Sequence, residues 1–171
     1  MKRLLLLALL LSALATQVSA SVITTNFGGT FANSGYVPDN NLSGWSDTRT
    51  LSGYTGLNVA DVSVTLNITG GWNGDLYGYL VHVDNNNNTG FVVLLNRVGT
   101  GTFPTYGYGE AGFNNVTLTD SGSYSSIQIY NGSGTAAAAL SGGPYSSAGN
   151  TGSAGLDQSY DGLTVNGTWT L

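Results

Sequence analysis

A run of alternating apolar and polar side chains constrains this chain more than any other feature. In Val62-Ser63-Val64-Thr65-Leu66-Asn67-Ile68 every second residue is apolar. Successive side chains of a β-strand point to opposite faces, so this spacing gathers the apolar residues on one face and predicts a half-buried strand. Helical apolar spacing is not sustained anywhere after residue 20. The chain is therefore expected to fold from strands.

Turn signals separate further strand-like segments. The Gly- and Asn-rich stretch 70–75 predicts a turn, and residues 76–83 predict the strand that follows it. After an Asn-rich turn at 84–90, residues 91–95 are apolar throughout, as expected for a strand covered on both faces. Residues 136–155 read as a long surface loop, with a single helical turn at 136–140. Shorter strands are predicted at residues 22–26, 48–51, 116–118, 127–130 and 163–171.

Many short strands separated by regular turn signals predict an all-β fold, an antiparallel two-sheet β-sandwich or jelly roll. The chain has no cysteine, so packing rather than disulfides must hold it together. The alternation also predicts which residues are buried. They are Val62, Val64, Leu66, Ile68, Leu76, Leu80, Val93 and Trp169.

The N-terminus predicts export. Lys2 and Arg3 precede an apolar run at residues 4–15, and small residues precede Ser21, as in a secretory signal peptide of residues 1–20. The apolar run is shorter than the ~20 residues that a membrane span needs. We therefore expect a secreted, extracellular or cell-surface module of residues 21–171, with no membrane span.

Charge argues against one class of partner. After the signal peptide, the chain keeps Arg49 and Arg97 against eight aspartates and Glu110. Such an acidic surface repels phosphate backbones, so nucleic acid is not an expected partner.

Five motifs in order resemble the P domain (P/Homo B domain) that accompanies subtilisin-like proteases. Together they cover about residues 37–171, and the resemblance implies a jelly-roll-like, galactose-binding-like sandwich. The first is the stretch 44–68. The others are Gly74-Asp75-Leu76, Leu94-Leu95-Asn96-Arg97-Val98-Gly99, Gly112-Phe113-Asn114-Asn115-Val116-Thr117 and Asn166-Gly167-Thr168-Trp169-Thr170-Leu171.

The chain departs from that family at two places. Members usually continue past the Trp strand with an Asp-rich turn and another strand, whereas this chain stops at Leu171. Either the last family strand is missing from the gene product, or an N-terminal segment such as residues 22–27 fills the vacant edge. At Leu118-Thr119-Asp120 many relatives carry an aromatic followed by paired acids, and here only Asp120 matches.

The sequence offers no self-contained catalytic machinery. Its one histidine, His82, lies between Val81 and Val83 at the end of a predicted strand, and no Gly-x-Ser-x-Gly elbow occurs. Aspartates next to Gly and Asn are more often turn formers than paired catalytic acids. We therefore expect no enzyme activity, although the P-domain resemblance implies an association with serine endopeptidases and proteolysis.

Calcium is the cofactor that the acidic turns suit, because calcium prefers loop oxygens. Asp84 to Gly90 imitates a calcium loop but has neither the Gly at its sixth position nor the Glu at its twelfth, so a plain turn is favoured. Asp75 and Asp120 match the family pattern and are the two candidate ligands. For both, a role in closing a turn is the competing interpretation.

Aromatic residues suggest a binding surface. Tyr77 and Tyr79 fall on the strand face opposite Leu76 and Leu80, and Trp72 lies in a glycine-rich loop. Exposed aromatic rings can stack on sugars or bind a protein, and the competing interpretation is that they cover the sandwich. Two functions follow: an accessory or interaction module that binds a protease domain or cell-surface protein, and a carbohydrate-binding β-sandwich with a glycan as partner.

Overall fold

The computed structural model describes residues 22–26, 29–41, 43–150 and 155–171, and the chain divides into compact units of residues 1–31 and 32–171. The predicted signal peptide lies outside the described residues. The strand predicted at residues 22–26 is wrong, because these residues lie in no strand and Val22 is exposed. Of the described residues, none belongs to a helix with the length and apolarity to cross a membrane.

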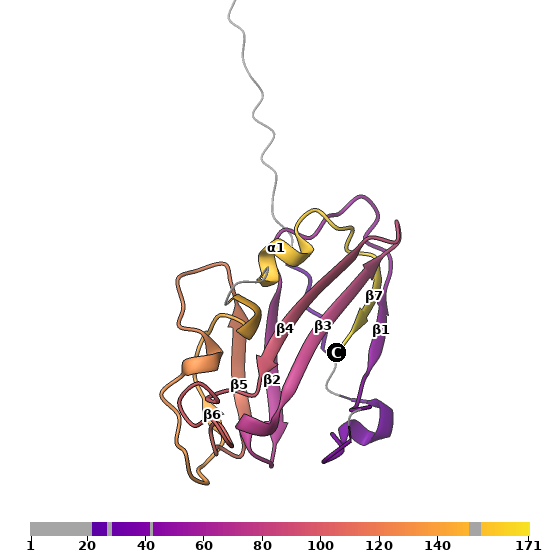
Figure 1. Ribbon diagram of the computed structural model, residues 1–171. Helices are drawn as coiled ribbons and strands as arrows, with labels where there is room; N and C mark the ends of the chain where they lie inside the picture. Colours follow the sequence, from indigo (N-terminus) through magenta and orange to yellow (C-terminus); the bar gives the residue numbers. More distant parts are fainter. Residues whose placement is uncertain (1–21, 27–28, 42, 151–154) are drawn as a thin grey trace, which may run out of the picture. The chain divides into compact units, whose positions relative to one another are not determined.

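The second unit is an all-β sandwich of two sheets (Figure 1). One sheet is antiparallel in the order β1-β7-β3-β4, and the other has the order β2-β5-β6. In the smaller sheet β2 and β5 are antiparallel, whereas β5 and β6 are parallel. The strands are β1 (Thr48–Leu51), β2 (Ser63–Thr69), β3 (Tyr77–Asp84), β4 (Thr89–Asn96), β5 (Gly112–Thr119), β6 (Leu140–Ser141) and β7 (Gly167–Thr170).

The buried side chains come from both sheets, as the alternation predicts. Leu66 and Leu80 of the predicted core are buried, and the other six members are half-buried. The exposed residues of β2 are the polar ones between them. The remaining strand contributions to the core are Val92, Leu94, Leu95, Phe113, Val116 and Leu118.

A bulge in β5 changes the alternation there. Leu66 pairs with Val116, and Ile68 pairs with Phe113. Between these two pairs β5 advances by three residues, whereas β2 advances by two. Asn115 takes a positive φ of 53°, and its backbone N–H donates to Asn67 Oδ1 at 3.0 Å. The bulge lets Phe113 and Val116 both face the core while Asn114 and Asn115 are exposed.

The prediction that β4 is covered on both faces is wrong. It is the last strand of the four-stranded sheet, and Phe91 is exposed. A register shift opposite Gly78 and Tyr79 places one extra residue in β4, so the neighbours Leu94 and Leu95 are both buried. The apolar run at residues 91–95 is therefore explained by the bulge and by the exposed ring of Phe91, and not by burial of both faces of β4.

Three predicted elements differ from the observed ones. Residues 127–130, predicted as a strand, begin with the 3-10 turn η3 (Ile127–Ile129). The helical turn predicted at 136–140 is absent, because Ala137 forms a parallel bridge with Glu110 and Leu140 begins β6, which pairs with β5 in parallel. Only 167–170 of the strand predicted at 163–171 form β7. The other helical elements are η1 (Ala32–Gly35), η2 (Asn73–Asp75), η4 (Ala148–Asn150) and α1 (Leu156–Tyr160).

Candidate functional site

His82 is a core residue. It is fully buried, and its Nδ1 and Nε2 lie 3.1 Å and 2.7 Å from the carbonyl oxygens of Thr168 and Thr164. Its ring stacks on Trp169. Both ring nitrogens thus face backbone carbonyl oxygens, and the side chain presents no surface to a substrate. The sequence places His82 on β3, but only the pairing of β3 with β7 brings it against Trp169.

The Asp84 turn is closed by its own carboxylate. Oδ1 accepts hydrogen bonds from the backbone N–H groups of Asn86 and Asn88, both at 2.8 Å, and Oδ2 accepts from Thr164 N–H at 3.2 Å. Burial raises the pKa of Asp84, but these hydrogen bonds outweigh it and lower the pKa to about 2. The carboxylate therefore acts as a turn former.

The two candidate calcium ligands lie far apart. The turn that holds Asp75 is bonded to the Gly112 end of β5, whereas Asp120 follows its Thr119 end. β5 spans seven residue steps, so at about 3.4 Å per step its two ends lie up to about 24 Å apart. One ion cannot bind both carboxylates.

Asp120 already has three donors. Its Oδ1 accepts from Ser147 N–H, and its Oδ2 accepts from the Ser147 hydroxyl and from Leu156 N–H. Within the described residues, no group of three or more His, Cys, Asp or Glu side chains could hold a metal ion. Asp75 and Asp120 therefore do not share one site. Asp120 anchors Ser147, which directly precedes η4, and Leu156 at the start of α1.

The sequence analysis missed an interaction between Asp157 and Asp61. The pKa of Asp157 is raised to about 6, first by burial and then by a hydrogen bond to Asp61 and by the charges of Asp61 and Asp120. Oδ1 of Asp157 is buried and has no hydrogen-bond partner. These acids come from separate segments, before β2, after β5 and in α1, so sequence spacing carries no signal for their meeting.

A buried polar network, also missed, holds the η2 turn. Asn73 is fully buried, its Nδ2 donates to Gly112 O at 3.0 Å, and its Oδ1 accepts from Gly112 N–H at 3.0 Å. Nδ2 also lies 3.1 Å from the Tyr130 hydroxyl, which donates to Glu110 at 2.9 Å. Burial raises the pKa of Tyr130, and Glu110 adds to it. The network fixes the loop that precedes β3.

Tyr77 and Tyr79 form an aromatic row with Phe91, a residue the sequence analysis did not include. The side chains are 55%, 43% and 49% exposed, respectively. Ring centroids lie 6.1 Å apart between Tyr77 and Tyr79, and 5.4 Å between Tyr79 and Phe91. We call these three residues the aromatic strip. It lies on the outer face of β3 and β4.

Trp72 does not belong to the aromatic strip. It is half-buried, and its ring meets Tyr106 edge to face with centroids 6.1 Å apart. Tyr106 in turn stacks on Phe103. The three aromatic ligand-binding candidates are therefore split between two surfaces.

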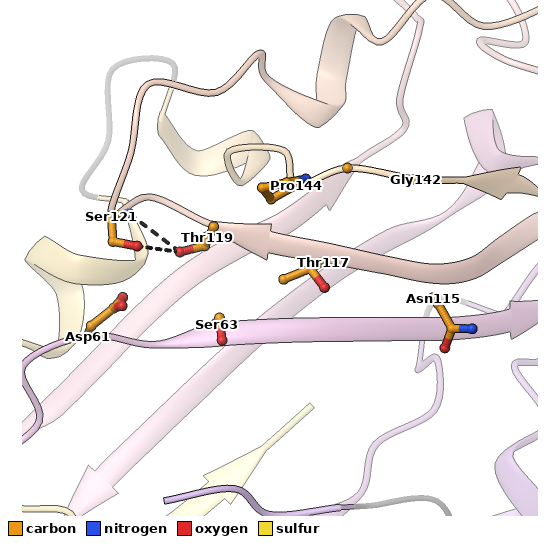
Figure 2. Close-up of a pocket in the computed structure, with 9 residues that line it drawn as sticks. Asp61, Ser63, Asn115, Thr117, Thr119, Ser121, Gly142 and Pro144 are labelled. Carbon is orange, nitrogen blue, oxygen red and sulfur yellow. Dashed lines mark hydrogen bonds between the residues drawn. The ribbon is translucent and has the colours of Figure 1, made fainter. Parts of the chain in front are cut away.

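A polar groove of about 510 Å³ lies over β2 and β5 (Figure 2). Side chains of both strands form its floor, and the segment 142–144 forms a wall. It is lined by Asp61, Ser63, Asn115, Thr117, Thr119, Ser121, Gly142, Gly143 and Pro144. We call it the β2–β5 groove. The polar positions of β2 were visible in the sequence, but the partner strand was not.

Comparison with known proteins found no matching family model, no matching curated protein and no matching solved structure.

Proposed function

We propose that this chain is an exported, non-catalytic accessory module that binds a protein partner through the aromatic strip. One observation carries the proposal: three exposed aromatic rings adjoin one another on a single sheet face. Aromatic residues dominate the energetics of protein interfaces because they bury large rigid surfaces at small entropic cost. Scattered exposed apolar residues need no explanation, whereas a contiguous group does.

The partner that we propose is a subtilisin-like serine endopeptidase. This part of the proposal is supported by the P-domain-like motifs, and the N-terminal sequence supports export. The non-catalytic role is supported by His82, which is buried against Trp169 and two carbonyl groups. A general acid or base must lie within hydrogen-bond distance of the substrate's proton, and a buried His82 does not reach one.

The alternative for the same strip is a carbohydrate-binding platform, which the exposure of Tyr77 and Tyr79 favours. A flat platform needs rings in one plane. The ring planes of Tyr77 and Tyr79 are inclined by 57°, and those of Tyr79 and Phe91 by 36°. An uneven row of rings suits the pockets of a protein surface better than the face of a sugar ring.

A site-specific photo-crosslinker tests the proposal. p-Benzoylphenylalanine replaces Tyr79 in the secreting organism, and the matched control replaces Tyr124, which is equally exposed at 43% but lies outside the strip. After irradiation, mass spectrometry should identify a subtilisin-like protease crosslinked through position 79 and not through position 124. Equal crosslinking at both positions, or none at position 79, contradicts docking through the strip. A different partner at position 79 contradicts the assignment to a protease.

A further inference from the structure

The β2–β5 groove is a second surface with its own chemistry. Its floor belongs to the three-stranded sheet, whereas the aromatic strip lies on β3 and β4 of the other sheet. Its volume of about 510 Å³ falls within the roughly 300–1,000 Å³ of small-molecule sites. The groove is therefore large enough to hold a small ligand or part of a polymer.

Hydrogen bonds order the hydroxyl groups in and beside the groove. Thr117 Oγ1 lies 2.9 Å from Thr65 Oγ1 across the strand pair. Thr119 Oγ1 lies 2.9 Å from Ser121 Oγ, as Figure 2 shows. In each pair one hydroxyl donates and the other accepts, and Thr119 Oγ1 also accepts from the backbone N–H of Ser121 at 3.4 Å. A hydroxyl has one donor and two acceptor positions, so each pair keeps one donor and further acceptor capacity for a ligand. The groove thus offers donors and acceptors at positions set by the sheet register.

Asn115 adds an amide to this surface. The β5 bulge gives it a left-handed backbone conformation with φ of 53°, and Asn67 holds its N–H. A non-glycine residue in this region of φ carries strain that surrounding contacts must offset. The bulge places the Asn115 side chain among the lining residues instead of in the core.

The lining excludes two ligand classes. Among the residues that line the groove, the only charged side chain is Asp61, and none is Lys, Arg or His, so an anionic ligand would meet no cation. No lining residue carries an aromatic or long aliphatic side chain, so an apolar ligand would gain little. Hydroxyl, amide and carboxylate groups match a ligand that is uncharged and carries many hydroxyls.

We propose that the β2–β5 groove binds a neutral glycan. The hydroxyls of Ser63, Thr117 and Ser121 and the amide of Asn115 exchange hydrogen bonds with sugar hydroxyls, and Asp61 accepts a charge-assisted one. The open groove suits a segment of a polysaccharide chain. This binding site is independent of the aromatic strip.

Affinity gel electrophoresis tests the groove with soluble β-glucan, xylan and galactomannan as neutral probes and alginate as the anionic one. At least one neutral polysaccharide should retard the purified protein. Thr117→Val, which removes one hydroxyl, should weaken the affinity behind that retardation about fivefold, because one hydrogen bond is worth about 1 kcal/mol. Ser63→Arg, which fills the groove from the exposed start of β2, should abolish it.

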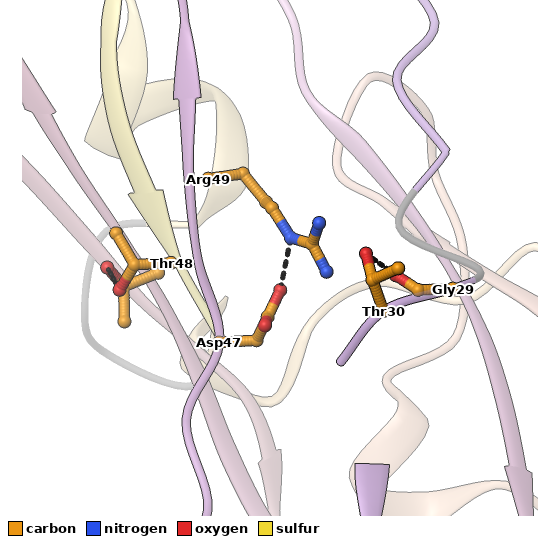
Figure 3. A network of polar contacts seen from close by, with 6 residues as sticks. Gly29, Thr30, Asp47, Thr48 and Arg49 are labelled. Atoms are coloured by element: carbon orange, nitrogen blue, oxygen red, sulfur yellow. Dashed lines mark hydrogen bonds and ion pairs between the residues drawn. The ribbon is translucent and has the colours of Figure 1, made fainter. Parts of the chain in front are cut away.

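Thr170→Val is the matched control. Thr170 forms the same kind of cross-strand hydroxyl pair, at 2.8 Å from Thr48, but on the other sheet. Thr48 is labelled in Figure 3. The control and Tyr79→Ala should bind like the parent chain, and melting curves should show that every variant is folded. Retardation that persists in Ser63→Arg, that is lost in Tyr79→Ala, or that occurs with alginate alone overturns the proposal. So does the absence of retardation by every neutral probe.

Discussion

The imidazole of His82 lies parallel to the indole of Trp169, with ring centroids 3.9 Å apart and planes inclined by 10°. The two residues are direct neighbours across β3 and β7. Tyr160 of α1 packs on the same indole, with centroids 5.3 Å apart. The chain's single histidine and its last tryptophan therefore join a central strand, the C-terminal strand and the helix into one core.

Replacing His82 should destabilise the fold. His82→Phe keeps a ring against Trp169 but loses the contacts with the Thr164 and Thr168 carbonyl groups. A buried polar group left without a partner costs about 1–3 kcal/mol, so the free energy of unfolding in urea should fall by that amount. Tyr79→Phe, on the exposed face of the same strand, is the control and should change it by less than about 0.5 kcal/mol. Equal values for both variants would contradict this role of His82.

Removing Asn73 should be at least as costly. Asn73→Ala leaves the backbone of Gly112 and the Tyr130 hydroxyl short of hydrogen bonds inside the protein. We expect a loss of about 2–4 kcal/mol in urea denaturation. Asn86→Ala, in an exposed turn, should lose less than about 0.5 kcal/mol. If the Asn73 variant unfolds at the same urea concentration as the parent, the network does not stabilise the η2 turn.

A methyl group at Gly90 should disturb the contact between β4 and α1. A Cβ there would collide with the Tyr160 ring and the Ser159 carbonyl oxygen. Tyr160 is fully buried and donates its hydroxyl proton to Leu80 O at 2.6 Å, so the ring cannot move freely. Gly90→Ala should therefore cost about 1–3 kcal/mol by overpacking. Gly101→Ala meets no atom within 4 Å and is the control. If neither variant changes the melting temperature, α1 can shift to accept the methyl group, and the predicted overpacking is wrong.

Stability should fall as pH rises through the pKa of Asp157. Its pKa in the fold, about 6, lies above the ordinary 3.8, so folding favours its protonated form. This contribution is complete below about pH 4 and is lost as pH rises through 6. Asp84 behaves oppositely: its pKa of about 2 gives a contribution present above 3.8 and lost as pH falls through 2.

These two shifts predict a stability maximum near pH 4 and a decline in stability from about pH 4 to pH 6. Thermal melts at successive pH values measure it. Asp157→Asn should remove the decline on the neutral side, whereas Asp75→Asn, a change at an exposed turn, should leave it in place. If stability still declines with rising pH in Asp157→Asn, another group causes the decline.

The sequence predicted the strands whose two faces differ in polarity. β1 matches its predicted bounds, and β2 and β3 lie within one residue of theirs, with the expected alternation in β2. Short segments without such contrast were predicted poorly. Residues 127–130 are apolar enough for a strand, yet Ile127 reaches the core from a 3-10 turn. Local pattern cannot separate these outcomes because both bury the same side chain.

The candidate sites divide in the same way. The exposure of Tyr77 and Tyr79 follows from the period of one strand and was predictable. Phe91 joins them only through the register of β3 and β4, and Asp61 meets Asp157 only because β2, α1 and the end of β5 converge. The separation of Asp75 from Asp120 is likewise set by the length of β5. Thus the sequence by itself determined which faces are apolar, because side-chain alternation is a local property, whereas only the tertiary structure decided which faces and loops meet, because strand order and bulges depend on contacts between residues far apart in the chain.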